Sequence, residues 1–227
     1  MLHMNRTWFC CFFLLALGLA CGSAAAGTIR GQVRVPSGGG DVSTAPNPYP
    51  GRASSMGKRP VSVRGSVLDA VVYVEAIAPS VDSTISDAGG APAMEQKDQA
   101  FGPRVLAVPV GATVAFPNRD PIFHSVFSVS PVKRFDLGKY GRGKSKSVKF
   151  TKAGVVNVYC DIHSDMAGFI LVVPNHAFVQ PDADGRFALP VLPPGTYTVI
   201  AWHPDLKSVR RTVQIPESGD ATVDLSF

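Results

Sequence analysis

The chain of 227 residues is long enough for one full domain and a small second one, and its formal net charge is +5. Its 22 glycines and 19 prolines, with sparse charges and recurring valine-rich runs, favour short strands joined by turns. The composition argues against a helical bundle and predicts an all-β protein.

The first 26 residues have the parts of a secretory signal peptide. Arg6 provides the positive start, residues 8–20 are apolar, and Ala24–Ala26 offer small residues for cleavage. We expect export to the periplasm or another non-cytosolic compartment, because the apolar stretch is short for a membrane span. A transmembrane anchor stays open as an alternative. A lipoprotein attached through Cys21 also stays open, although Gly18–Ala20 matches a lipobox poorly.

Cleavage after Ala26 would remove Cys10, Cys11 and Cys21 and leave only Cys160 in the exported chain. No intramolecular disulfide could then form. An unpaired thiol in an oxidising compartment is a liability unless it is buried or bound. Cys160 is therefore a candidate functional residue.

Candidate strands and loops alternate up to a boundary at Pro174–Asn175. Loops are expected at 36–62 and 79–99, which are small and polar. Strands are expected at 27–35, 69–78, 104–109, 112–117, 124–129, 145–150, 155–160 and 169–173. In 155–160 the alternation places Val156, Val158 and Cys160 on one inward face. About eight strands are enough for a Greek-key sandwich.

The tail beyond this boundary contains further strand patterns at 186–189, 196–202 and 209–215. With about 50 residues it is too short to bury a core comfortably alone, so we expect it to pack on the first domain. The predicted division of the chain is a leader over 1–26, a strand and loop over 27–66, a main domain over 67–174 and a small β module over 175–227.

One motif after a predicted strand carries the chemistry. Cys160, His163 and Met166 form C-x-x-H-x-x-M, so a thiolate, an imidazole and a thioether can converge from one tight loop. His124, at the start of another predicted strand, is the candidate fourth donor. Two imidazoles and a thiolate with a weak axial methionine are the donor set of a blue-copper site. We therefore predict one copper ion per chain, held by His124, Cys160, His163 and Met166.

Several shorter motifs accompany these donors in the same order as in a known family. They are V-G-x-T-V at Val110–Val114, Asn118-Arg119 ahead of His124, and T-x-A-G at Thr151–Gly154. With them, Arg104–Val173 resembles the cupredoxins, most closely those of the amicyanin and plastocyanin type. The resemblance implies a Greek-key cupredoxin β-sandwich that transfers single electrons between redox proteins and is not an enzyme. The resemblance also implies an association with methylamine utilization.

This chain differs from many cupredoxins at one position next to a ligand, and the resemblance also predicts a docking surface. Many cupredoxins carry an asparagine after the first histidine ligand, where its side chain ties the ligand loops together, whereas this chain has Ser125. In the family, apolar residues surround the solvent edge of the loop histidine. Here Pro121, Ile122, Phe123 and Ala167 are expected to form that ring around His163 and to dock a redox partner.

The tail beyond residue 175 resembles a second, different family. Its run D-G-R-F-x-L-P-x-L-P-P-G-T-Y-T-V, within residues 183–202, resembles carboxypeptidase regulatory-like β modules. Such modules are non-catalytic, which implies a structural or binding role.

The stretch 133–152 holds eight basic residues and one acid, while the rest of the expected exported chain sums to −3. It is interpreted either as a solvated hairpin loop or as a docking surface for an acidic redox protein. Nucleic acid is not expected, because stacking aromatics are not interleaved. Residues 138–145 match the P-loop expression, but the alternating residues that follow predict a strand, so no nucleotide is expected.

Other functions were weighed against the electron shuttle. A copper carrier or storage protein would use similar ligands, and a structural surface module would leave the site vestigial. Zinc is disfavoured because a thioether is a poor zinc ligand, and a Cys–His nucleophile lacks an orienting third group. His176 and His203, as isolated histidines, are not expected to bind metal. A multicopper oxidase would need more histidines than the four that follow the leader.

Overall fold

A computed structural model describes residues 26–36, 65–85, 90–217 and 219–227. Strands dominate these residues, and the helices are short: η1 is a 3₁₀ turn over Val67–Asp69 and α1 covers Pro79–Asp82. The described residues contain no helix with the length and apolar character needed to cross a membrane. The protein is all-β, as its composition predicts. The expected leader up to residue 25, including Cys21, and the expected loop from residue 37 lie outside the described residues.

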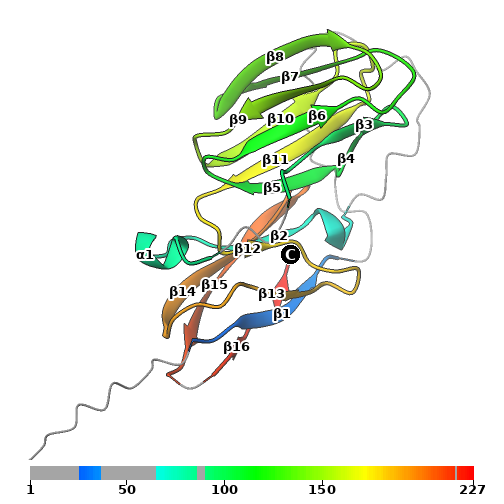
Figure 1. Ribbon diagram of the computed structural model, residues 1–227. Helices are drawn as coiled ribbons and strands as arrows, with labels where there is room; N and C mark the ends of the chain where they lie inside the picture. Colours follow the sequence, from blue (N-terminus) through cyan, green and yellow to red (C-terminus); the bar gives the residue numbers. More distant parts are fainter. Residues whose placement is uncertain (1–25, 37–64, 86–89, 218) are drawn as a thin grey trace, which may run out of the picture.

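The described strands build two sandwiches (Figure 1). The first contains β3 (Glu95–Lys97), β4 (Ala100–Gly102), β5 (Val105–Pro109), β6 (Thr113–Pro117), β7 (His124–Ser130), β8 (Lys133–Tyr140), β9 (Ser145–Lys149), β10 (Gly154–Tyr159) and β11 (Ala167–Val173). The second contains β1 (Ile29–Arg34), β2 (Val71–Val74), β12 (Phe178–Val179), β13 (Arg186–Ala188), β14 (Gly195–His203), β15 (Leu206–Ile215), β16 (Ala221–Thr222) and β17 (Leu225–Ser226).

The first sandwich has a five-stranded sheet in the order β5-β11-β10-β7-β8, in which β5 and β11 are parallel and the other pairs antiparallel. The pairs β6–β9 and β3–β4 cover its inner face, and single bridges join β3 to the β6 segment. Between the layers lies a core of buried side chains that includes Val114, Phe116, Val126, Val156 and Ile170. The predicted inward face of β10 is confirmed, because Val156, Val158 and Cys160 are all buried.

The second sandwich differs from the expected division of the chain. β1 pairs with β13, β16 and β17, and β2 pairs with β12 and β14. Both early strands therefore belong with the tail and not with the main domain. The physical reason is core size: residues 175–227 alone offer too little apolar surface. Ile29, Val33, Val72 and Val74 complete their core. The first sandwich is consequently inserted between two strands of the second.

A buried contact joins the two sandwiches, as expected for a tail that packs on the first domain. Apolar side chains of β2, β5, β11 and β14 fill it: Val71, Val105, Phe169, Leu171, Val173 and the partly buried Trp202. At its edge the Arg104 guanidinium lies 5.1 Å from the centre of the Phe169 ring. Arg104 donates hydrogen bonds to the carboxylates of Asp69 and Asp205, one on each side of its guanidinium.

Three local predictions need correction. The expected strand over 69–78 is shorter, since β2 covers Val71–Val74 only. The expected loop 79–99 contains α1, which begins at Pro79 because a proline fixes a helical φ where no N–H is needed. β8 was not expected as a strand. Its lysines and arginine hide an alternation in which Phe135 and Leu137 are partly buried against the core.

Candidate metal centre

Three of the four predicted metal ligands meet at one end of the first sandwich. His124 is the first residue of β7, and Cys160 and His163 follow the last residue of β10. The Nδ1 atoms of the two histidines lie 3.1 Å apart. The Cys160 Sγ lies 3.8 Å from Nδ1 of His124 and 3.7 Å from Nδ1 of His163. Within the described parts of the chain, no other group of three or more histidine, cysteine, aspartate or glutamate side chains brings its ligand atoms close enough together to hold one metal ion.

This triangle of donor atoms fits a small metal ion. A trigonal centre with bonds of about 2.0 Å to nitrogen and about 2.3 Å to sulfur separates the nitrogens by about 3.5 Å and each nitrogen from sulfur by about 3.7 Å. The sulfur–nitrogen distances agree with these values, and the two nitrogens are slightly closer. The donor set, with two imidazoles and one thiolate, suits copper. The residues present therefore fit the predicted group.

Met166 lies at the end of the same loop. It is buried at 2% exposure and belongs to the same core cluster as Cys160. Two backbone hydrogen bonds close the loop: Cys160 N donates to Met166 O, and Met166 N donates to His163 O. Its axial role remains a prediction.

Asp120 is a fifth residue of the centre and is not among the residues predicted from the sequence. Its carboxylate is 6% exposed and lies 2.7 Å from Nε2 of His124, the ring nitrogen opposite the triangle. Backbone N–H groups of Asp98 and Gln99 also donate to it, at 2.7 and 2.9 Å. Both residues have positive φ, 54° and 56°, in the tight turn between β3 and β4. A left-handed conformation is costly for such side chains, and hydrogen bonds to a buried carboxylate help to hold it.

The environment of the centre lowers the pKa values of both Asp120 and His163. Burial alone would raise the pKa of the Asp120 carboxyl, but the hydrogen bonds from Gln99, His124 and Asp98 outweigh it and hold the pKa below its usual value. Burial, aided by the neighbouring His124, lowers the pKa of His163. A carboxylate beside Nε2 fixes the proton of His124 on that nitrogen and leaves the lone pair of Nδ1 for a metal.

Ser125 ties the two ligand segments together. Its side chain is buried, and its Oγ accepts a hydrogen bond of 2.7 Å from the Asp161 N–H, next to Cys160. The same hydroxyl lies 4.0 Å from the Cys160 Sγ and can direct its proton toward the sulfur. A serine thus links β7 to the ligand loop at the position where many cupredoxins have an asparagine.

Several exposed residues next to the ligands in sequence are apolar. His124 and Cys160 are buried, whereas His163 is partly exposed. Of the expected ring, Pro121, Ile122 and Phe123 are exposed and Ala167 is partly exposed. Ile162 is another exposed apolar residue near the ligands. Its exposed fraction is 41%, compared with 63% for Phe123 and 37% for Ile122. The position of Ile162, directly before His163, was the signal that could have included it.

The other predicted motifs lie elsewhere. His203 is buried, with Nε2 3.2 Å from the Ser66 carbonyl, and His176 pairs with Asp82. The P-loop-like residues 138–145 end β8 and form the turn before β9, so a strand follows them as predicted.

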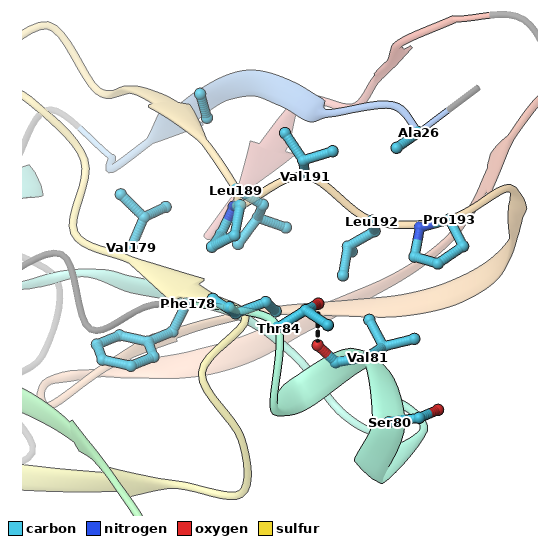
Figure 2. Close-up of a pocket in the computed structure, with 13 residues that line it drawn as sticks. Ala26, Ser80, Val81, Thr84, Phe178, Val179, Leu189, Val191, Leu192 and Pro193 are labelled. Atoms are coloured by element: carbon cyan, nitrogen blue, oxygen red, sulfur yellow. Dashed lines mark hydrogen bonds between the residues drawn. The ribbon is translucent and has the colours of Figure 1, made fainter. Parts of the chain in front are cut away.

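A groove of mostly apolar lining belongs to the second sandwich (Figure 2). It has a volume of about 710 Å³ and lies between α1 with its following turn and the segment 188–193. Its lining is mostly apolar, and Thr84, one of its few polar residues, donates its hydroxyl to the Val81 carbonyl. It includes none of the predicted metal ligands.

No protein-family model matches the chain, and no curated protein matches it. Solved structures align with less than half of it. A purple cupredoxin from Nitrosopumilus maritimus is 22% identical over 36% of this chain and 98% of its own, with a TM-score of 0.33. An amicyanin variant with Cu(I) is 24% identical over 44% of this chain and 97% of its own, with a TM-score of 0.35. A copper-containing nitrite reductase from Thermus scotoductus is 27% identical over 43% of this chain and 27% of its own, with a TM-score of 0.36. Because all three TM-scores are below 0.5, the assignment of the centre depends on its own geometry.

Proposed function

We propose that this protein is an exported carrier of single electrons that holds one type 1 copper ion on His124, Cys160, His163 and Met166. The leader-like residues 1–26 support export, and the periplasm is the compartment that we expect. The donor triangle of two Nδ1 atoms and one Sγ is the observation that supports the copper site. Copper supplies a one-electron cycle between Cu(I) and Cu(II).

The protein's own contribution is a ligand set that is largely buried and held by neighbouring side chains. His124, Cys160 and Met166 are at most 2% exposed. Asp120 holds the His124 ring, and Ser125 holds the ligand loop against β7. The fold would impose a coordination geometry intermediate between those that Cu(I) and Cu(II) prefer. Because this geometry changes little between the two oxidation states, the barrier to electron transfer stays low. A set of four protein ligands favours a carrier over an enzyme, since an enzyme would need an open position for a substrate.

His163 is the expected exit for the electron. It is the one predicted ligand with partial exposure, and the exposed Ile122, Phe123 and Ile162 directly precede the ligand histidines or lie within two residues of them in sequence. Apolar side chains at this edge exclude water when a partner docks, which brings the two redox centres close together.

The test is the visible spectrum of residues 27–227 after addition of Cu(II), beside the Cys160→Ser variant. Cys160 is the only cysteine of this segment, so the control removes the only thiolate. We expect an intense blue thiolate-to-copper band that the variant lacks. A colourless protein that still binds one metal ion would refute type 1 copper. Ready transfer of copper to a chelator, with no reversible electrochemistry, would favour the copper carrier instead.

A further inference from the structure

The basic stretch 133–152 is not one patch in three dimensions. Strand pairing places Lys133 opposite Ser130, at the far end of β7, and Tyr140 opposite His124, at the ligand end. Lys149 returns to the far end, because it pairs with Thr113. The eight cations are thus divided between the two ends of the first sandwich. Lys139, Arg142 and Lys144 lie at the ligand end.

The turn between β8 and β9 is anchored beside the centre. Asn118 N donates to the Lys144 carbonyl at 2.9 Å, and Gly143 N donates to the Asn118 carbonyl at 2.8 Å. The Asn118 side chain in turn donates to the carbonyls of Ile122 and Tyr140. Arg142 and Lys144 are therefore held next to the segment that leads into His124.

Arg142 and Lys144 are available for a partner. Both are exposed, and neither forms an ion pair with any residue in the described ranges. Two neighbouring cations of the stretch 133–152 are engaged: Lys139 lies 3.8 Å from the Asp161 carboxylate, and Lys146 lies over the Tyr140 ring. The turn thus presents two uncompensated positive charges.

These charges border the apolar surface of the centre. The Phe123 ring lies 3.4 Å from the position that a Cβ would take on Gly141, the residue before Arg142. Phe123 is 63% exposed. An apolar centre with a charged rim is the usual composition of a protein–protein interface, whereas nucleic acid binding would require more stacking aromatics.

We infer that Arg142 and Lys144 orient an acidic electron-exchange protein on the ligand end, where its carboxylates pair with the turn while its apolar surface covers Phe123. This inference rests on the proposed function. Arginine binds carboxylates through two parallel hydrogen bonds, so it fixes the orientation of the partner protein in addition to attracting it. The cations at the far end play no part in this encounter.

The first test uses small oxidants in place of the partner. The reduced copper protein gives one electron to hexacyanoferrate(III), which becomes hexacyanoferrate(II). At about 10 mM ionic strength we expect Arg142→Ser/Lys144→Ser to slow this reaction roughly three- to tenfold, because two charges near the docking site are lost. The matched control, Lys149→Ser/Lys152→Ser, should slow it less than about twofold. A cationic oxidant, tris(phenanthroline)cobalt(III), should react faster with the first variant.

The second test does not depend on electron transfer. Hexaglutamate is titrated into the ¹⁵N-labelled protein, with and without copper, and amide shifts are expected at Phe123 and residues 141–144. Equal slowing by the two double variants, or hexaglutamate shifts confined to the far end, would overturn the inference. Absence of reaction with both oxidants would instead refute the proposed function, and the hexaglutamate shifts would still decide the surface.

Discussion

Replacement of Asp120 by asparagine should weaken copper binding without removing a ligand. The carboxylate accepts three hydrogen bonds: Oδ1 from Asp98, and Oδ2 from Gln99 and from the His124 ring. An asparagine has one acceptor oxygen. If that oxygen stays opposite the Asp98 N–H, the amide nitrogen faces the Gln99 N–H, and two donors oppose each other.

In either orientation of the amide, the His124 ring loses the charged acceptor that holds its proton on Nε2. A neutral histidine beside an amide N–H can accept at Nε2 and protonate Nδ1, and Nδ1 is the atom that faces the metal. A hydrogen bond to a charged group contributes about 1.5–3 kcal/mol, and about 1.4 kcal/mol corresponds to tenfold in affinity. We therefore expect Asp120→Asn to bind Cu(I) roughly 10- to 100-fold more weakly, which is the range usual for loss of a carboxylate behind a ligating histidine.

The assay is competition for Cu(I) against a chromogenic chelator. Asp165→Asn is the matched control, since it makes the same charge change at an exposed residue of the ligand loop. The control should bind within about twofold of the unaltered protein, because exposed charges are screened. Equal affinities for Asp120→Asn and Asp165→Asn would show that the buried carboxylate does not orient His124.

Three further changes probe the ligand loop, a buried histidine and the joint between the sandwiches. Ser125→Ala leaves the Asp161 N–H without its acceptor, so the free energy of unfolding should fall by about 1–3 kcal/mol in urea titrations. Ser125→Asn should restore the tie, and a lower reduction potential in the alanine variant alone would agree with loss of a hydrogen bond to the sulfur. Burial lowers the pKa of His203. The unfolded chain therefore takes up this proton first, and stability is complete above the unfolded pKa of about 6.5 and decreases as pH falls below it. Between pH 7.5 and 5.5 the free energy of unfolding should decrease by up to about 1.4 kcal/mol more in the unaltered protein than in His203→Gln; identical pH profiles would contradict this. Arg104→Ala leaves the carboxylates of Asp69 and Asp205, both 12% exposed, without their cation. Because Arg104 is itself partly exposed, we expect a loss of about 2 kcal/mol and separate melting of the two sandwiches in calorimetry, and a single unshifted transition would count against the joint.

The residues that could be predicted from sequence owe their positions to local rules. The alternation of residues 155–160 determines which side chains of β10 face inward, and the spacing of Cys160, His163 and Met166 places all three on one loop. His124 could be predicted because it begins a strand that must pair nearby. These inferences depend on the chain within a few residues of each site.

Asp120 and the pairing of β1 and β2 depend on contacts that local patterns do not encode. The Asp120 carboxylate is held by the backbone N–H groups of the turn at Asp98–Gln99, which only the packing of β3 beside the β6 segment brings within reach. β2 has the same valine-rich composition whether it pairs with the first or the second sandwich. The choice depends on which core lacks apolar surface, and this is a property of the complete chain.

The insertion of the first sandwich has a topological consequence. β2 and β12 are antiparallel neighbours, with Tyr73 opposite Phe178 and Val72 opposite Val179. The whole first sandwich is therefore the connection of a single β-hairpin, with its two ends side by side. Loop-closure entropy grows slowly with length, so a hairpin can accept a domain-sized connection at small additional cost. The first sandwich is in this sense one continuous insertion that could be removed, replaced by a short turn, or transplanted to another protein.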